Sequence, residues 1–262
     1  MSDYLEAALA AAKAAEEVIL RHYRSSGGPS RGRNLEVRLK QDKSPVTAAD
    51  VEAEKVIRRI IESRFPRHGF HGEETGRTAP DAEFLWLVDP IDGTKAFVRE
   101  YPMFSTQIAL AHRGEIIVGV SNAPVYGELC WAQRGQGAWL GETRLHVSAV
   151  GTFEEAALST GNLKSLASSS RWTGLGSVVS RLNRIRGYGD FLHYHLLAAG
   201  KIDAVIESDV DILDIAALSI IVQEAGGRFT DLDGKPISLG IRSVMATNGP
   251  LHQPLLEALS AA

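Results

Sequence analysis

Two acids that directly follow an apolar run constrain this chain more than any other feature of its sequence. The run is Phe-Leu-Trp-Leu-Val at 84–88, which has the length of a buried strand, and Asp-Pro-Ile-Asp-Gly-Thr at 89–94 ends it. Two carboxylates at the end of a buried strand are electrostatically costly unless something neutralises them. Pro90 fixes one backbone angle and Gly93 allows a tight turn, so both carboxylates can point to one side beyond the strand.

A divalent cation is the natural partner for Asp89 and Asp92. Mg²⁺ prefers oxygen ligands, keeps several waters and bridges protein carboxylates to a substrate phosphate. Gly93 and Thr94 can also begin a helix, which would leave free N–H groups where an anion binds. The alternative is an ordinary turn, because Asp-Pro and Asp-Gly are common turn formers. Turn chemistry does not explain why two acids follow an apolar strand, and the sequence therefore favours a site for a metal and a phosphate.

Hydrophobic periodicity along the chain predicts helices layered on sheets. Residues 1–150 contain two amphipathic helices, at about 2–24 and about 47–65, separated by a Gly/Ser/Arg-rich loop at 25–34 and followed by a mostly antiparallel meander. Helix and strand patterns alternate over residues 151–262. We therefore expect a single α+β unit over 1–262 with these two halves. The inward face of the second helix is predicted to consist of Val46, Ala49, Ala53, Val56, Ile60 and Ile61.

The charge and cysteine content exclude several classes of protein. The 28 Lys and Arg against 32 Asp and Glu give a net charge of −4 without basic clusters, which argues against a protein that coats nucleic acid. The single cysteine, Cys130, excludes an internal disulfide and a multi-cysteine zinc site, and its apolar surroundings predict a core residue, as they do for Trp86, Trp131 and Trp139. The sequence has neither a signal-peptide pattern nor a long apolar run, so we expect a cytoplasmic protein without a membrane partner.

Other acids in the chain each have an ordinary structural explanation. Glu73 and Glu74 are consistent with a solvated acidic loop. Asp214 precedes an apolar helix and can act as its N-cap. Thr47 and Asp50 have the spacing of a capping box at the start of the second helix. None of these acids indicates a metal site when it is taken alone.

Four motifs carry these acids in a fixed order along the chain. They are Lys40 with Ser44–Asp50, Gly72-Glu73-Glu74, Asp89–Thr94, and Leu213–Ala217 with Glu224–Gly227. In set and order they resemble the inositol monophosphatase family, over about residues 5–259. The resemblance implies a layered α-β-α-β-α sandwich of the inositol monophosphatase and fructose-1,6-bisphosphatase type. Two positions depart from the family pattern, Leu213 in place of Trp and Ala96 in place of Asn, and from these we expect altered packing or rate rather than a dead site.

The activity that the resemblance implies is Mg²⁺-dependent hydrolysis of a phosphate monoester, with two or three ions per active site. Such a reaction needs the phosphate neutralised, the pKa of the attacking water lowered and the leaving alkoxide stabilised, all of which a cation provides. The implied metal ligands are Glu73, Asp89, the Ile91 carbonyl, Asp92 and Asp214, with Asp89 shared between two ions. The implied catalytic residues are Asp50, Glu73 and Thr94, of which Asp50 and Thr94 orient and deprotonate the attacking water.

The resemblance also implies a set of substrate contacts. They are Lys40, Asp92, Gly93, Thr94, Gly189, Asp190 and Glu207. The carboxylates of Asp190 and Glu207 suit either hydroxyl groups or a cationic leaving group. Segments 44–50, 95–99 and 188–191 are most similar to the histidinol-phosphate phosphatase branch, which makes histidinol phosphate, an intermediate of histidine biosynthesis, the preferred substrate. His193 and His195 are expected in the core or on a helix surface rather than at the substrate.

Three alternatives to a histidinol-phosphatase remain. The first is an inositol-1-monophosphatase. The second is a broader-specificity sugar or nucleotide 3′-phosphatase, although mainly acids and histidines lie between 188 and 207, where a nucleotide would need basic and stacking residues. The third is a non-catalytic metal-dependent binding protein, against which the intact acids argue. Family members are commonly homodimers, so we expect a homodimer that binds a small phosphorylated metabolite and no nucleic acid.

Overall fold

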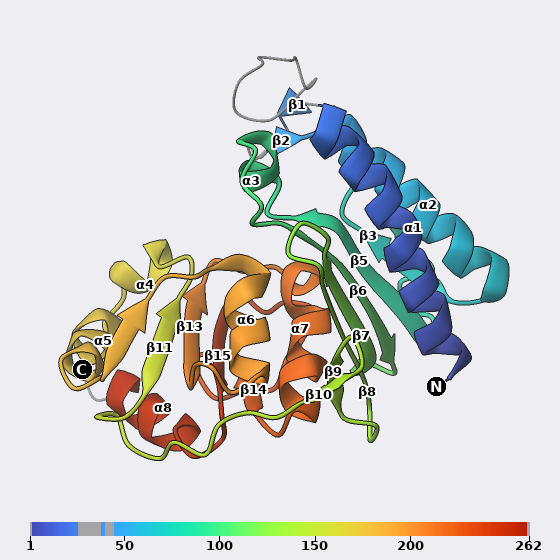
Figure 1. Ribbon diagram of the computed structural model, residues 1–262. Coiled ribbons are helices and arrows are strands. Elements are labelled where there is room, and N and C mark those ends of the chain that lie inside the picture. The colour runs from blue at the N-terminus through green and yellow to red at the C-terminus, as the bar shows by residue number, and fades with distance from the viewer. Residues whose placement is uncertain (1, 26–37, 40–44, 261–262) are drawn as a thin grey trace.

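The computed structural model describes residues 2–25, 38–39 and 45–260, which form five layers of helices and sheets (Figure 1). An eight-stranded and a five-stranded sheet alternate with three helical layers. The outer layer on the eight-stranded sheet consists of α1 (Asp3–Ser25) and α2 (Ala48–Arg64). The middle layer, between the two sheets, consists of α6 (Asp190–Ala198) and α7 (Ile212–Glu224). The outer layer on the five-stranded sheet consists of α4 (Lys164–Ala167), α5 (Arg171–Val179) and α8 (His252–Ser260). This order confirms the expected α-β-α-β-α sandwich.

The eight-stranded sheet carries the predicted meander. In spatial order its strands are β10 (Thr143–Leu145), β9 (Ala138–Leu140), β8 (Glu128–Gln133), β7 (Glu115–Ala123), β6 (Ser105–His112), β5 (Phe84–Asp92), β3 (Gly69–Gly72) and β4 (Gly76–Thr78). All neighbours are antiparallel except β3 and β5. The tight turn between β6 and β7 uses Arg113 and Gly114, whose φ angles of 51° and 83° suit a two-residue hairpin. A two-stranded sheet of β1 (Arg38–Leu39) and β2 (Pro45–Val46) lies near α3 (Thr94–Val98).

The five-stranded sheet mixes parallel and antiparallel pairs. In spatial order its strands are β12 (Arg184–Arg186), β11 (Ala157–Thr160), β13 (Ala204–Ser208), β15 (Ser243–Thr247) and β14 (Arg228–Thr230). β11 is parallel to both β12 and β13, whereas β15 is antiparallel to β13 and β14. The alternation of helix and strand patterns after residue 150 produces this sheet. The description of the chain as one unit with two halves, 1–150 and 151–262, stays a prediction.

A hydrophobic cluster underlies each of the three helical layers. One cluster surrounds α6 and α7 between the two sheets, the second lies beneath α1 and α2, and the third lies beneath α5 and α8. α7 packs against both sheets, and ten of its 13 residues are buried. An ionisable side chain on such a helix is costly to bury without a partner, so Asp214 near its start requires one. Among the described residues, no helix has the length and apolar character needed to cross a membrane.

The inward face of α2 differs from the predicted one. Val56 and Ile60 are only half-buried, and Ile57 and Glu54 are buried in their place. α2 packs against both α1 and β5. The residues that it buries there recur at about every fourth position, because residues four apart lie on the same face of a helix. The side chain of Val46 and most of the loop predicted at 25–34 lie outside the described part of the chain.

Two of the three tryptophans predicted in the core are not fully buried. Trp86 is buried, and so is Cys130. Trp131 and Trp139 are half-buried cross-strand neighbours on β8 and β9, and their rings stack with centroids 5.5 Å apart. An apolar strand pattern therefore identified the strands correctly, but it did not separate a core face from an aromatic pair near the edge of the sheet.

Candidate active site

The end of β5 supplies two of the acids. The strand does not end at Val88, as the sequence predicted, but continues to Asp92. Its register against β6 shifts between Asp89 and Asp92, and β3 is paired with it only as far as Val88. Pro90 lies where the ladder is already irregular, so its missing N–H costs little pairing. The backbone of β6 therefore extends β5 beyond the apolar run and carries both acids with it.

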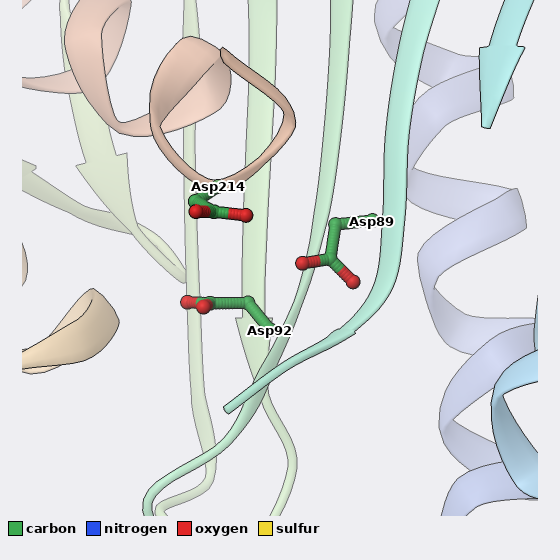
Figure 2. Close-up of side chains that lie close together, drawn as sticks. All are labelled: Asp89, Asp92 and Asp214. Carbon is green, nitrogen blue, oxygen red and sulfur yellow. The ribbon is translucent and has the colours of Figure 1, made fainter. Parts of the chain in front are cut away.

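The start of α7 supplies the third acid. The N-cap of α7 is Asp211, and Asp214 is the third residue of the capping box, because its Oδ2 accepts a hydrogen bond from the N–H of Asp211 at 3.1 Å. The alternative that Asp214 is simply the N-cap is wrong, since the helix begins at Ile212. The capping box fixes the Asp214 side chain beside the end of β5 (Figure 2).

Asp89, Asp92 and Asp214 converge on one point between β5 and α7 (Figure 2). One carboxylate oxygen from each lies within 4.8 Å of the others, and all three residues line a cleft of about 380 Å³. The predicted site residues that line this cleft are Glu73, Asp89, Ile91, Asp92, Gly93, Thr94, Asp190 and Asp214. Gly189 precedes one lining residue, and Asp50 contacts another. Lys40 lies outside the described residues.

Burial and mutual repulsion raise the pKa of the clustered carboxyl groups. Burial raises the pKa of Asp89 well above its ordinary value, and the charges of Glu73, Asp92 and Asp214 raise it further. Burial and then the neighbouring acids also raise the pKa of Asp92 well above its ordinary value. Burial is the main cause that raises the pKa of Asp214 to about 7. The ionised cluster is therefore unfavourable without a cation, and its oxygen donors fit a hard divalent ion such as Mg²⁺.

Asp50 completes the capping box that the sequence predicted, and it also contacts a residue of the cleft, Thr94. It is fully buried, and its Oδ2 accepts hydrogen bonds from the Thr47 N–H at 2.8 Å and the Thr47 hydroxyl at 2.6 Å. The hydroxyl of Thr94 lies 3.3 Å from Asp50 Oδ1 and 3.0 Å from the Ile91 carbonyl oxygen. Burial raises the pKa of Asp50, and the bonds from Thr47 oppose that rise. The start of α2 is thus tied to the start of α3.

Asp190 also lines the cleft, as the first residue of α6. Its φ angle is +44°, a left-handed conformation that is uncommon for a residue other than Gly. Gly189 before it is also in a positive-φ conformation, at 74°. Burial and the charge of Glu207 raise the pKa of Asp190, whereas His193 and Lys95 lower it. Backbone strain of this kind is concentrated at functional sites, where surrounding structure maintains it.

Glu207 on β13 and Asp190 line the same small cavity of about 30 Å³, which shares Asp92, Asp190 and Asp214 with the cleft. The Tyr194 hydroxyl donates to its Oε2 at 2.8 Å, and His193 Nε2 lies 3.3 Å from the same oxygen. Burial alone raises the pKa of Glu207, but the hydrogen bond and charge of His193, and then the Tyr194 hydroxyl, outweigh it and lower the pKa. Glu207 is therefore held as a carboxylate.

Two further residues of this region were not predicted. Asn162 lines both cavities, and its N–H donates to Glu207 Oε1 at 3.3 Å. Tyr194 lies one helical turn after Asp190, a spacing that points both side chains to one side of α6 and was a usable signal. His193 is a buried core residue, as expected, but it contacts a predicted substrate residue, Glu207.

A chain of buried polar side chains runs from the cleft into the middle layer. Gln107 Nε2 donates to the hydroxyls of Ser105 at 2.7 Å and Ser121 at 3.1 Å, and Ser121 lies 2.9 Å from His195 Nε2. His195 Nδ1 lies 2.9 Å from Glu128. The expectation that His195 is a core residue is therefore confirmed. Three successive polar residues, Ser105, Thr106 and Gln107, begin the otherwise apolar strand β6, and they were the sequence signal for this chain.

The two departures from the family pattern lie in different surroundings. Leu213 is buried in the cluster around α6 and α7. Ala96 lines the cleft on α3. A change at Leu213 therefore acts through packing of the start of α7, whereas Ala96 leaves space in the cleft itself.

Comparisons with known proteins agree with the fold. The model of the inositol monophosphatase family matches residues 1–262. The histidinol-phosphatase of Mycobacterium tuberculosis is 42% identical, over 87% of this chain and 89% of that protein. The inositol-1-monophosphatase of Caulobacter vibrioides is 35% identical, over 87% and 92%. The crystal structure of the extragenic suppressor protein suhB from Bartonella henselae is similar with a TM-score of 0.88 at 32% identity, covering 98% of both chains.

The family match, these two relatives and this crystal structure confirm the layered fold and the expectation of a phosphoric monoester hydrolase. The match extends over the whole chain rather than over one motif. The chain therefore belongs to the inositol monophosphatase family.

Proposed function

We propose that this protein hydrolyses histidinol phosphate to histidinol and phosphate, a step of histidine biosynthesis. The observation that carries the proposal is the pair of acids Asp190 and Glu207 beside the three convergent aspartates. Histidinol carries an ammonium group and an imidazole, and charge-assisted hydrogen bonds to carboxylates are stronger than bonds from neutral hydroxyls. The higher identity to a histidinol-phosphatase than to an inositol-1-monophosphatase supports the same choice.

Inositol 1-phosphate is the second candidate substrate. Glu207 accepts a hydrogen bond from the hydroxyl of Tyr194, and a carboxylate in this position accepts an inositol hydroxyl by the same chemistry. A broader sugar or nucleotide phosphatase has less support, because Asp190 and Glu207 repel a further phosphate group.

We assign the metal site to Glu73, Asp89, the Ile91 carbonyl, Asp92 and Asp214, as ligands of two or three Mg²⁺. When bound, the ions neutralise the phosphate, lower the pKa of the attacking water and stabilise the leaving alkoxide. Gly93 and Thr94, at the start of α3, bind phosphate oxygens through their N–H groups. The Thr94 hydroxyl and Asp50 orient the attacking water, and the raised pKa of Asp50 brings it closer to the range of a general base.

The setting of the enzyme is inferred from its family and from the sequence pattern. We infer a cytoplasmic homodimer that takes a small phosphorylated metabolite and neither nucleic acid nor a membrane as partner. Light scattering of the purified protein measures the oligomeric state directly, and a monomer at micromolar concentration would contradict the homodimer.

Phosphate release with and without Mg²⁺ tests the proposed function. The esters to compare are histidinol phosphate, inositol 1-phosphate, fructose 1,6-bisphosphate and adenosine 3′,5′-bisphosphate. We expect the highest kcat/KM for histidinol phosphate and no release in EDTA. A clear preference for inositol 1-phosphate would select the second candidate. Absence of release from every ester, with or without Mg²⁺, would point to a binding protein instead.

The substitution Glu207→Gln is expected to reduce activity selectively toward the cationic ester. A charged hydrogen bond contributes roughly 1.5–3 kcal/mol, so kcat/KM for histidinol phosphate should fall about tenfold to a hundredfold. Hydrolysis of β-glycerophosphate, which carries no cation, should change by less than about threefold. Asp209→Asn, an acid-to-amide change on an exposed residue two positions later, is the matched control. An equal fall for both esters would mean that Glu207 does not recognise the cation.

A further inference from the structure

Glu54 on α2 is a fully buried carboxylate that none of the proposed catalytic roles uses. It stands one helical turn after Asp50, on the same inward face of the helix. Its Oε2 accepts a hydrogen bond from the Glu74 N–H, and its Oε1 accepts one from the Thr75 N–H, both at 2.7 Å. Both oxygens of Glu54 are therefore occupied by the backbone of one short segment.

Gly72 shows how closely this segment approaches Glu54. A Cβ atom at Gly72 would lie 2.5 Å from the carboxyl carbon and from Oε1 of Glu54, much closer than side chains pack. The next N–H, that of Glu73, donates to the Val88 carbonyl of β5 at 3.2 Å. Three successive N–H groups, of residues 73–75, are thus fixed by β5 on one side and by Glu54 on the other.

We propose that Glu54 is a positioning residue for the metal site. Glu54 holds the backbone of residues 73–75 so that the Glu73 carboxylate faces Asp89. Glu73 and Asp89 line the same cleft. Asp50, one turn earlier on α2, contacts Thr94, which also lines that cleft. A single helix face therefore sets the placement of the Glu73 segment relative to the start of α3. The inference rests on the proposed function in one respect, that Glu73 is a metal ligand.

The contact of Glu54 with the N–H groups of Glu74 and Thr75, called the clamp below, requires a carboxylate rather than an amide. A carboxylate offers lone pairs on two oxygens and has no N–H of its own. Gln at position 54 has nearly the same shape, but its NH₂ group would point at one of the two backbone N–H groups. One N–H would then lose its acceptor in a buried place, while the other keeps its bond. Glu54→Gln should consequently loosen the segment without leaving a cavity.

Mg²⁺ binding measured calorimetrically without substrate is the first test. Mutation of a group that orients a metal ligand typically weakens metal binding about tenfold to a hundredfold. We therefore expect the dissociation constant of Mg²⁺ to be about tenfold higher, or more, in Glu54→Gln than in the wild type. Glu52→Gln is the matched control, because Glu52 lies on the same helix but is half-exposed and paired with Arg21 and His22. At saturating Mg²⁺, KM for the phosphate ester should stay within about twofold. Unchanged Mg²⁺ affinity in folded Glu54→Gln would overturn the proposal.

A double-mutant cycle with Glu73→Gln separates positioning from a general effect on folding. If Glu54 acts through Glu73, adding Glu54→Gln to Glu73→Gln should weaken Mg²⁺ binding by less than about twofold. An effect of Glu54→Gln that is as large in the Glu73→Gln background as in the wild type would contradict action through Glu73.

Amide hydrogen exchange at Glu74 and Thr75 gives a readout that needs no metal. We expect both amides to be protected in the wild type in EDTA, and exchange at one or both to accelerate at least about tenfold in Glu54→Gln while α2 itself stays protected. Equal protection in the variant would overturn the clamp. Protected wild-type amides without any Mg²⁺ binding would instead refute the proposed metal site, and with it the positioning role, while leaving the clamp as a purely structural contact.

Discussion

Replacement of Asp89 by Asn is expected to abolish Mg²⁺-dependent phosphate release and, at the same time, to stabilise the metal-free protein. Metal ions contribute several kcal/mol to stabilisation of the transition state, and Asp89 is the ligand proposed to be shared between two of them. Its loss should therefore lower kcat/KM by at least about a thousandfold. The measurement is phosphate release at saturating Mg²⁺, with circular dichroism to show that the fold is intact.

The opposite change in stability follows from the surroundings of Asp89. Burial and the charges of neighbouring acids raise its pKa well above the ordinary value, so its ionised form opposes folding at neutral pH. Asn has the same shape, and its amide oxygen can keep the hydrogen bond that Asp89 Oδ1 accepts from the Ile91 N–H at 2.9 Å. We expect the melting temperature in EDTA at pH 8 to rise by several degrees.

Asp81→Asn is the matched control for this pair of effects, because Asp81 is exposed and lies away from the cleft. It should change neither activity nor melting temperature. Substantial activity in Asp89→Asn would remove Asp89 from the metal site. A lower melting temperature in EDTA would show that Asp89 stabilises the metal-free fold.

The parts of the site that are local in sequence were predictable. Asp89, Asp92, Gly93 and Thr94 lie within six positions, and the combination of an apolar strand, two acids and a tight turn already indicated their chemistry. The capping box of Thr47 and Asp50 was predictable for the same reason, because capping depends on residues three apart.

The parts that depend on packing between distant segments were not predictable from one sequence. Glu54 was not recognised, because its partners at Glu74 and Thr75 are about 20 positions away and join it only when α2 lies against β3 and β5. The extension of β5 to Asp92 depends on pairing with β6, which an apolar pattern does not encode. Propensity and periodicity describe the preferences of single elements, whereas these contacts are properties of their assembly.

Stability of the metal-free protein is expected to fall as the pH rises, and Mg²⁺ is expected to reverse the fall. Burial raises the pKa of Asp214 to about 7 in the folded protein, against roughly 4 for an unfolded Asp. Between these values the folded state binds more protons than the unfolded state, so the free energy of unfolding decreases with increasing pH. The contribution of protonated Asp214 to the free energy of unfolding is fully present below about pH 4 and is lost as the pH rises to about 7. The raised pKa values of Asp89 and Asp92 act in the same direction.

Mg²⁺ should restore the stability that ionisation of the aspartates removes, because the ion binds only the carboxylate form. A ligand at a hundred times its dissociation constant stabilises by about 2.7 kcal/mol, which corresponds to a rise in melting temperature of roughly 5–10 °C for a chain of this size. We expect that rise at pH 8 and a rise of less than about 2 °C at pH 5, where protons compete with the ion. Differential scanning calorimetry in EDTA and in excess Mg²⁺ measures both.

Asp214→Asn isolates the contribution of the cluster from that of other titrating groups. Its amide oxygen can still accept the bond from the Asp211 N–H that completes the capping box, so the start of α7 should persist. In this variant the decline of stability between pH 4 and pH 7 should be shallower in EDTA, and the Mg²⁺-induced rise at pH 8 should shrink. If Mg²⁺ instead raises the melting temperature equally at pH 5 and pH 8, or equally in Asp214→Asn and the wild type, then the ion binds somewhere other than between β5 and α7.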